Sequence, residues 1–283
     1  MVKRNRAIGW KHAKITGHEN EHLISNLILN DSKIQKNIFN TAKSKIISIN
    51  KIEPQNGNEV YVESVFDDTT PSKTDIYIYK DEKSSINISV KKSMAGQVFL
   101  IGVDRFIDGF EKQYNIIICE KVKRAISLFW GYADDTNQII EKYSHKYKSY
   151  ELKKHRLVKE TMDNYNPELS QALIAWFNQN IENIFDFCFS RGLAKNKNDW
   201  ADLLWYKNAV NENDLDELFC IDDIKRKLTK TVKYGIKNGG TTIQLPFGFV
   251  QWHSPTKVVP GNMQFHHNYK KIKEIIEERY GFI

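Results

Sequence analysis

The sequence predicts a mixed α+β protein, in which helices flank a central mixed β-sheet and a strand-rich part follows near the C-terminus. The first observation is the order of patterns: a helical stretch, a meander of strand-like runs, further helices, then strands again. The second is length, because 283 residues can bury a large core without disulfides. The third is composition, since 41% hydrophobic and 27% charged residues are typical of globular domains.

Each element follows from hydrophobic periodicity and from the residues that interrupt it. A helix is predicted over 18–49, with a break near Asn30-Asp31, and Pro167 suits the first turn of another. The further helices are predicted at 120–130, 166–188, 199–233 (interrupted at 211–213) and 269–279. The strands are predicted at 59–66, 74–79, 86–91, 114–119, 241–245, 247–253 and 262–266.

The sequence disfavours several classes of protein. No run of about 18 apolar residues occurs, so we expect no membrane span and no membrane partner. The basic first residues lack the apolar segment of a secretory signal. Cys119, Cys188 and Cys220 are far apart, which disfavours a disulfide framework and excludes a CxxC metal knuckle. A reducing cytoplasm is therefore the expected location.

Charge is distributed unevenly along the chain. Residues 1–51 contain ten basic and three acidic side chains, a net charge of +7, and residues 225–283 contain eleven and three, a net charge of +8. Residues 52–224 contain 21 basic and 29 acidic side chains, a net charge of −8. Such a directional field attracts polyanions, nucleic acid first. The alternative is a solvated, lysine-rich surface.

Two strands of the first third form a candidate catalytic hairpin. If Ile78 pairs with Ile86, Asp75 lies opposite Ser89, and a slip of two residues would place it opposite Lys91. A carboxylate, a hydroxyl and an ammonium then share one patch of sheet. A carboxylate can hold Mg²⁺, which lowers the pKa of a bound water, and a nearby lysine can stabilise negative charge. The alternative is a polar outer face with an incidental Asp–Lys pair.

A second carboxylate joins this patch from the first helix. Glu21 precedes Ile24 by three residues and Ile28 by seven, so it lies on the inward side of the helix. Carboxylates are rarely buried without a partner, and a metal or lysine at the hairpin would provide one. The alternative is that Glu21, like Glu19, only complements the helix dipole.

The C-terminal segment carries polar side chains suited to reading DNA. Asn and Gln amides can form bidentate hydrogen bonds with base edges, and lysines can bind phosphates. The alternative is a polar strand face over a core that contains Met263 and Phe265. The candidate DNA-binding residues are Gln251, His253, Ser254, Lys257, Asn262, Gln264, His266, Lys270 and Lys271, together with Ser93 and Gln97 in the segment after Lys91.

Several motifs in one order resemble a known family. One motif resembles the PD-(D/E)xK nuclease pattern: Thr74-Asp75 is followed, after thirteen residues, by Ser89-Val90-Lys91. More narrowly, the chain is similar to small type II restriction endonucleases that cut GC-rich four-base sites, the MspI and HinP type. The further matching segments are 17–21, Ser72-Lys73-Thr74-Asp75, Lys123–Gly131, Phe247–Val250 and Asn262–His266.

The resemblance implies a catalytic core and a set of roles. Asp75 and Lys91 would be catalytic with Ser89 and Glu21, and the Mg²⁺ ligands would be Asp75, Ser89, Val90 and Glu21. Ser89 stands where these relatives carry an amide and the wider superfamily an acid. Residues 1–165 would form the catalytic core and 166–283 the helical and strand-rich recognition part, packed as one unit.

The resemblance also implies the partners. The substrate would be double-stranded DNA with a short GC-containing palindrome, cut by a monomer or weak dimer. A DNA methyltransferase of the same specificity would accompany the enzyme. The alternatives are a structure-selective or repair nuclease of the same superfamily and a DNA-binding protein without catalysis.

Overall fold

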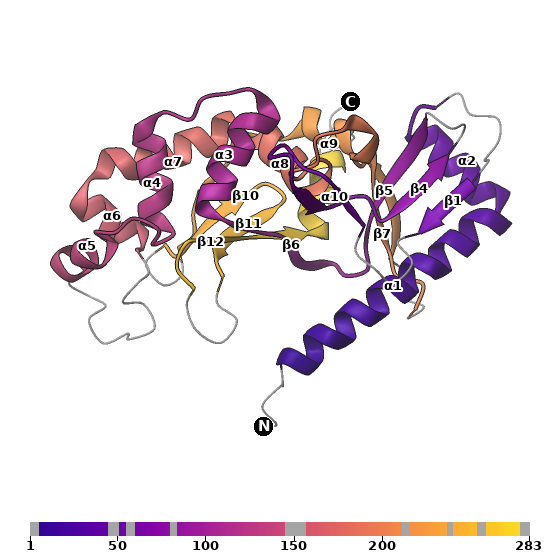
Figure 1. Ribbon diagram of the computed structural model, residues 1–283, viewed down its shortest axis with the longest axis horizontal. Coiled ribbons are helices and arrows are strands. Elements are labelled where there is room, and N and C mark those ends of the chain that lie inside the picture. The colour runs from indigo at the N-terminus through magenta and orange to yellow at the C-terminus, as the bar shows by residue number, and fades with distance from the viewer. Residues whose placement is uncertain are drawn as a thin grey trace. The chain divides into compact units, whose positions relative to one another are not determined.

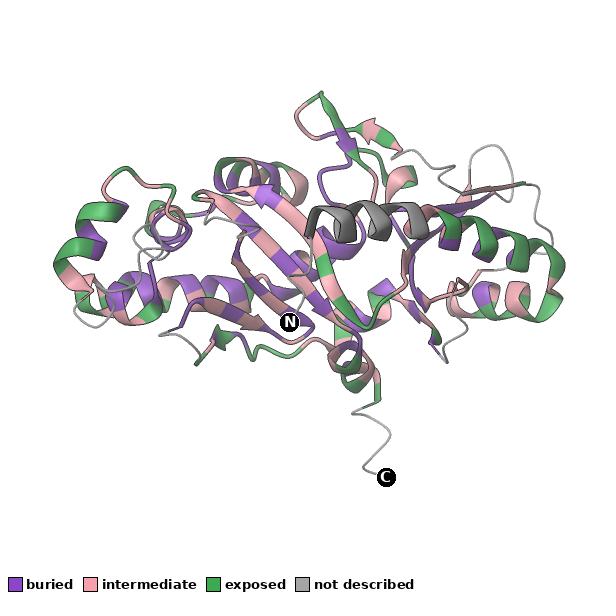
Figure 2. Cartoon of the chain, turned by 90° about the horizontal axis from the view of Figure 1, so that it is seen from below, coloured by how far each residue is buried: buried purple, intermediate pink, exposed green. Residues whose placement is uncertain are grey.

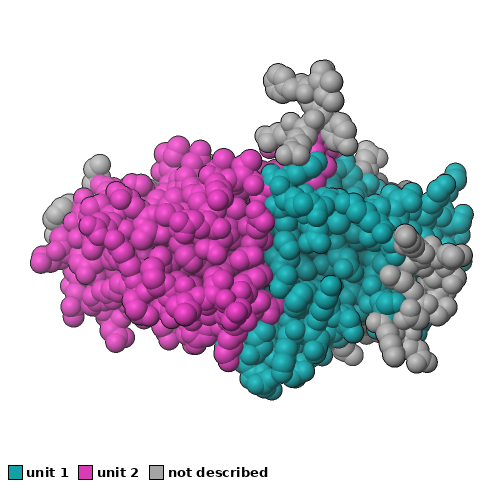
Figure 3. Space-filling model, turned by 90° about the horizontal axis from the view of Figure 1, so that it is seen from above, with its two compact units in different colours: residues 1–94, 185–227 teal, residues 95–184, 228–283 magenta. Residues whose placement is uncertain are grey.

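The computed structural model describes residues 6–44, 51–54, 60–79, 84–144, 157–210, 215–236, 240–253 and 259–277, with side chains described from residue 17 onward. The chain forms two compact units, each built from two separate segments (Figure 3). Unit 1 comprises residues 1–94 and 185–227, and unit 2 comprises residues 95–184 and 228–283. The units are therefore not divided at residue 165, and the assignment of catalysis to 1–165 and recognition to 166–283 stays a prediction.

Unit 1 contains the predicted mixed sheet flanked by helices (Figure 1). Its five strands lie in the order β1-β4-β5-β7-β8, and only β5 and β7 are parallel. The strands are β1 (Lys51–Pro54), β4 (Ile76–Tyr79), β5 (Ser85–Lys91), β7 (Leu203–Lys207) and β8 (Asp216–Cys220). The small pair is β2 (Tyr61–Glu63) and β3 (Thr69–Pro71), and the helices are α1 (Arg6–Asn30), α2 (Ser32–Thr41), α9 (Ile221–Lys227) and the short η2 (Lys197–Asp199).

The break between the first two helices has a local cause. Asp31 is in an extended conformation, and its carboxylate accepts hydrogen bonds from the backbone N–H groups of Lys33 and Ile34. An aspartate in this position caps a new helix and ends the previous one. The predicted break near Asn30-Asp31 is confirmed, and it turns α2 back over the sheet, where Ile38 is fully buried.

Unit 2 is a second sheet covered by helices. Its five antiparallel strands lie in the order β6-β12-β11-β10-β9. Figure 2 shows buried and partly exposed bands alternating along these strands, as expected for a sheet with one covered face. The strands are β6 (Ala95–Gly102), β9 (Lys233–Tyr234), β10 (Thr242–Leu245), β11 (Gly248–Trp252) and β12 (Asn262–Asn268). The helices are α3 (Val103–Tyr114), α4 (Glu120–Phe129), α5 (Thr136–Tyr143), α6 (Lys159–Tyr165), α7 (Pro167–Gln179) and α10 (Tyr269–Glu277), while α8 (Ile181–Phe189) runs from unit 2 into unit 1.

The mixed α+β class is confirmed, and two predicted elements are wrong. The segment 114–119 is not a strand, because α3 continues to Tyr114 and Asn115 ends it in the left-handed conformation at φ 49°. The described part of 199–233 contains the strands β7 and β8 followed by the short helix α9, so the predicted helix is wrong over most of its length. Central strands are buried on both faces, so β7 reads as a continuous apolar run without the alternation that marks a strand.

Neither β6 nor α3 was predicted from the sequence, and the helix predicted over 166–188 is two helices separated at Asn180. Within the described residues, no helix has the length and apolar content needed to cross a membrane.

Candidate active site

The β4–β5 hairpin has the register expected from its isoleucines. Ile78 pairs with Ile86 and Ile76 with Ile88. The predicted pairing of Ile78 with Ile86 is therefore confirmed. The strand pairing ends at Ile76, and the preceding Asp75 N–H donates to the Ile88 carbonyl at 2.8 Å, which keeps Asp75 beside Ser89.

Asp75, Ser89 and Lys91 meet at the end of this hairpin. One carboxylate oxygen of Asp75, Oδ2, accepts from the Val90 N–H at 2.6 Å and from Ser89 Oγ at 3.4 Å. Lys91 Nζ donates to Ser89 Oγ at 2.7 Å and to the Val90 carbonyl at 2.9 Å, and it lies 3.7 Å from Asp75 Oδ2. The Asp75 side chain is 20% exposed, so its carboxylate stays accessible to a further ligand.

The two faces of the hairpin fix these side chains. The isoleucine face is buried in an apolar cluster with Ile24 and Ile28 of α1 and Ile38 of α2. The opposite face is covered too, since Asn87 is 2% exposed and donates through Nδ2 to the carbonyls of Asn198 and Trp200. With both faces packed, Ser89 is only 1% exposed and has little freedom to move.

Hydrogen bonds of Asn20, the residue before Glu21, attach helix α1 to the end of strand β7. The Asn20 side chain is 1% exposed, donates to the Lys207 carbonyl at 2.9 Å and accepts from the Ala209 N–H at 2.6 Å. These two groups lie at the carboxyl end of β7, which runs parallel to β5 and pairs there with Lys91 through Tyr206. The clamp therefore holds Glu21 at the same end of the sheet as Lys91.

The pKa of Glu21 reports its surroundings. It is raised from 4.5 to about 8, first by burial and then by the negative charge of Asp75, while Lys91 and Lys92 act in the opposite direction. Glu21 is thus within electrostatic reach of the predicted catalytic residues. Two carboxylates that disfavour each other's charge, in a partly buried place, form a donor set that a divalent cation would stabilise.

The residues fit a Mg²⁺ ion that keeps part of its water shell. The described part of the chain contains no group of three or more His, Cys, Asp or Glu side chains arranged to hold a metal. Mg²⁺ commonly binds one or two carboxylates and completes its shell with waters and substrate phosphates. Asp75 and Glu21 meet that need, with the Ser89 hydroxyl and the Val90 carbonyl beside them.

Three side chains around this cluster were not selected from the sequence. His18 lies one turn before Glu21, with its Nδ1 at 3.3 Å from Glu21 Oε2. Lys73 is partly buried, and the loss of solvent around its ammonium lowers its pKa to about 7. Partial burial lowers the pKa of Lys92 as well. Lys73 was visible in the motif Ser72-Lys73-Thr74-Asp75, whereas the role of His18 depends on tertiary packing.

The candidate DNA-reading face lies in unit 2. Gln264 is the centre of an amide row across three strands: it accepts from Gln251 Nε2 at 3.2 Å and donates to Gln97 Oε1 at 2.6 Å. His266 lies 3.4 Å from Gln251 Nε2 and stacks on Phe249 with ring centroids 4.5 Å apart. The predicted alternation on β12 is confirmed, since Met263 and Phe265 are buried on the other face.

The remaining candidates are dispersed around this row. Asn262 begins β12 and donates to the Pro260 carbonyl at 3.2 Å, while the His253 N–H donates to the Asn262 carbonyl. Ser93 is exposed in unit 1, in the connection between β5 and β6. Ser254 and Lys257 lie outside the described residues.

The two lysines of α10 differ from each other. Lys270 is exposed, whereas Lys271 Nζ donates to the carbonyls of Leu245 at 3.1 Å and Gly248 at 3.3 Å. Burial lowers the pKa of Lys271. The ammonium of Lys271 is therefore engaged with the turn between β10 and β11.

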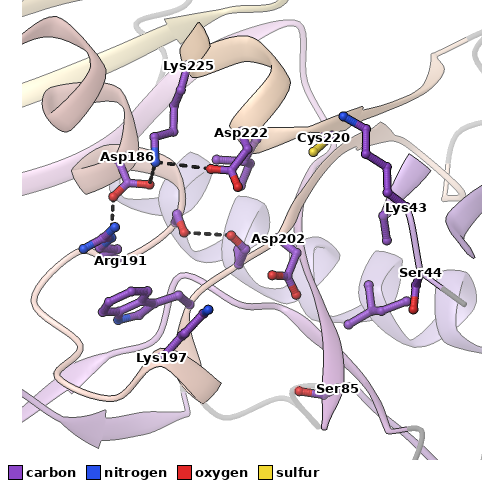
Figure 4. A pocket seen from close by; sticks show the side chains of 16 residues that line it. Lys43, Ser44, Ser85, Asp186, Arg191, Lys197, Asp202, Cys220, Asp222 and Lys225 are labelled. Carbon is purple, nitrogen blue, oxygen red and sulfur yellow. Dashed lines mark hydrogen bonds and ion pairs between the residues drawn. The ribbon is translucent and has the colours of Figure 1, made fainter. Parts of the chain in front are cut away.

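Unit 1 also contains a polar pocket of about 630 Å³, shown in Figure 4. Asp186 at its wall is 3% exposed and pairs with Arg191 at 2.5 Å and Lys225 at 2.9 Å, and Arg191 stacks on Trp200. Ser85, at the start of β5, lines the pocket, so it lies about 20 Å along the strand from Lys91. Asp186, Arg191, Lys225 and Asp222 of the wall are joined in one ion-pair network, which is separate from the Asp75 cluster.

Comparison with known proteins yields a structural similarity to a solved nuclease. The solved structure of the restriction endonuclease MspI in complex with its cognate DNA matches with a TM-score of 0.47 and 14% sequence identity, over 87% of this chain and 81% of that chain. No protein-family model matches the sequence, and no curated protein does. A similarity of this size assigns no function to this chain.

Proposed function

We propose that the chain is a Mg²⁺-dependent, sequence-specific endonuclease of the restriction type that hydrolyses double-stranded DNA. The observation that carries the proposal is the convergence of Asp75, Ser89 and Lys91 in the predicted register, with Glu21 brought to the same end of the sheet. A carboxylate pair beside an ammonium is a combination that serves phosphodiester hydrolysis.

The residues would divide the chemistry between them. Bound Mg²⁺ would polarise the scissile phosphate and lower the pKa of a coordinated water. Asp75 and Glu21 would hold the ion, with the partly exposed carboxylate of Asp75 as the principal donor. Lys91 donates to Ser89 and Val90, and its ammonium would offset the negative charge that develops on the phosphate.

Recognition would depend on neutral groups. Gln97, Gln251 and Gln264 form a row of amides whose remaining donors and acceptors suit base edges in the major groove. The basic residues around them, such as Lys270, would bind phosphates and set the register. The substrate we propose is a short GC-containing palindrome, cut by a monomer or weak dimer, with a partner methyltransferase protecting the cell's own DNA in the cytoplasm.

Incubation with plasmid DNA, with and without Mg²⁺, tests the proposal. Discrete fragments that require Mg²⁺ are expected. Smearing would instead indicate a structure-selective or repair nuclease, and intact plasmid would indicate a DNA-binding protein without catalysis. Ca²⁺ is expected to support binding with little or no cutting, which separates the two steps.

Lys91→Ala and Ser89→Ala assign the roles within the hairpin. Lys91→Ala should remove nearly all cleavage, because it removes the ammonium that would offset the negative charge on the phosphate. Ser89→Ala should cost less, since a neutral hydroxyl contributes less to a cation than a carboxylate does. Equal losses in the two variants would show that the hydroxyl acts through Lys91.

A further inference from the structure

His18 occupies a distinctive place beside the carboxylate cluster. Its ring lies one helical turn before Glu21, with Nδ1 at 3.3 Å from Glu21 Oε2. The side chains of His18 and Glu21 are 18% and 13% exposed, so the contact is shielded from solvent. Surface ion pairs contribute little to stability, but a shielded contact to a candidate metal ligand can control its orientation.

The far nitrogen of the ring determines which tautomer is favoured. Nε2 is buried and has no hydrogen-bond partner among the described residues. A neutral imidazole carries one proton, and Glu21, which must be ionised to bind a cation, can then only accept. With the proton on Nδ1, the ring donates to Glu21 and leaves Nε2 as a bare acceptor. The opposite tautomer would bury an unpaired N–H and face a lone pair toward the carboxylate, which costs more.

We propose that His18 is a positioning residue that donates from Nδ1 to Glu21 and aims this carboxylate, together with Asp75, at one divalent cation. The inference rests on the proposed function, since it concerns the same metal site. Glu21 is held from two directions: Asn20 fixes the helix backbone on the end of β7, and His18 fixes the side chain. A group that hydrogen-bonds a metal ligand typically changes metal affinity by about 10–100-fold when removed.

The test measures binding of Mn²⁺ alone to the full-length protein by electron paramagnetic resonance. His18→Ala should weaken Mn²⁺ binding about 10–100-fold. His18→Asn should restore affinity to within a few-fold of wild type, because its amide nitrogen lies near the position of Nδ1. His18→Gln extends the amide toward the position of Nε2 and should behave like His18→Ala. His22→Ala is the matched control, since the His22 side chain is exposed on the same helix, and this variant should bind Mn²⁺ like wild type.

A double-mutant cycle decides whether His18 acts through Glu21. In a Glu21→Gln background, His18→Ala should cause no further loss of Mn²⁺ affinity. Unchanged affinity in His18→Ala, or rescue by Gln instead of Asn, would overturn the inference. DNA cleavage by the wild type is scored separately, so a protein that binds Mn²⁺ through His18 and Glu21 but cuts no DNA would overturn the endonuclease proposal alone. Thermal melting of each variant confirms that it is folded.

Discussion

The end of β5 in unit 1 and the open face of β12 in unit 2 collect polar side chains in different ways. At the end of β5 the groups are ionisable: Lys91 lies 3.7 Å from Asp75, and burial together with the charge of Asp75 raises the pKa of Glu21 to about 8. On β12 the groups are neutral amides joined in a row, and burial lowers the pKa of the neighbouring His266. The first arrangement is suited to hold a cation, and the second to present hydrogen-bond donors and acceptors.

The two regions also differ in how firmly they are held. Ser89 and Asn20 are each 1% exposed, and the Asn20 side chain is bonded on both of its polar atoms. Gln97 and Gln264 are more exposed, and their amides contact mainly one another. A rigid site keeps reacting groups within a narrow geometry, whereas an exposed amide row can exchange its internal hydrogen bonds for bonds to a ligand.

Asp75→Ala is expected to have the largest effect and to separate the two regions. Removing the carboxylate takes away several kcal/mol of metal-dependent stabilisation, a loss of cleavage on the order of 10³-fold. Affinity for DNA in Ca²⁺ should change far less, because the unit 2 face and the basic surface are intact. Single-turnover cleavage and a gel-shift titration measure the two quantities. Asp222→Asn, at the wall of the polar pocket, is the control and should cut normally; a D75A protein that cuts at the wild-type rate would place catalysis elsewhere.

Glu21→Gln should change how stability depends on pH. In the folded, metal-free protein the pKa of Glu21 is about 8, against 4.5 for an ordinary glutamate. The folded state therefore keeps a proton that the unfolded chain has released, and stability falls as pH rises from about 4.5 to about 8. We expect Glu21→Gln to remove a loss on the order of 1–3 kcal/mol between pH 5 and pH 8.

Urea unfolding with a chelator, at pH 5 and at pH 8, measures the free energy of unfolding for both proteins. At pH 8, added Mg²⁺ should raise the free energy of unfolding of the wild type, and it should raise that of Glu21→Gln much less. Parallel profiles of stability against pH for the two proteins would mean that the pKa of Glu21 is not raised in the folded protein. Glu21 and Asp75 would then not share a site.

The local features of the hairpin were predictable from the sequence. The register followed from the isoleucines, because pairing Ile78 with Ile86 keeps one face apolar and the other polar. The inward side of α1 followed from the spacing of Glu21, Ile24 and Ile28, two of which are fully buried isoleucines. Periodicity carries this information because neighbouring residues in one element decide it.

Features that depend on distant partners were not predictable. Strand β7 was taken for helix because every residue of Leu203–Tyr206 is buried, so no alternation marks it. Asn20 acquires its role from backbone groups 187 and 189 residues away. His18 gains importance only from the burial of its Nε2, which no spacing rule reports.

Gln264→Ala tests whether the amide row of unit 2 reads DNA bases. Gln264 is the central member of the amide row, and a bidentate base contact is worth about 1–3 kcal/mol of discrimination. Affinity for cognate DNA should fall by about one to two orders of magnitude, while affinity for scrambled duplexes barely changes. His266→Ala should follow the same pattern. An equal loss on both duplexes would make this face a backbone clamp and move base reading to the segment Ser93–Gln97.

The smallest expected effect distinguishes the two lysines of α10. Lys270 is exposed, so Lys270→Ala should weaken binding to all DNA sequences alike and lower the slope of log affinity against log salt by about one. From sequence the same result was predicted for Lys271→Ala. The ammonium of Lys271, however, donates to the carbonyls of Leu245 and Gly248 in the β10–β11 turn, and burial already lowers its pKa.

Loss of Lys271 would leave those carbonyls without their partner, so Lys271→Ala should lower the free energy of unfolding by about 1–2 kcal/mol. It should also leave the salt slope nearly unchanged. Salt titrations of affinity and urea unfolding, run on both variants, form a crossed test. If Lys271→Ala lowers the salt slope by one at unchanged stability, the Lys271 ammonium leaves the β10–β11 turn to bind a phosphate. The charged group in unit 2 would then be held less firmly than Lys91 at the end of β5, because DNA could displace its hydrogen bonds.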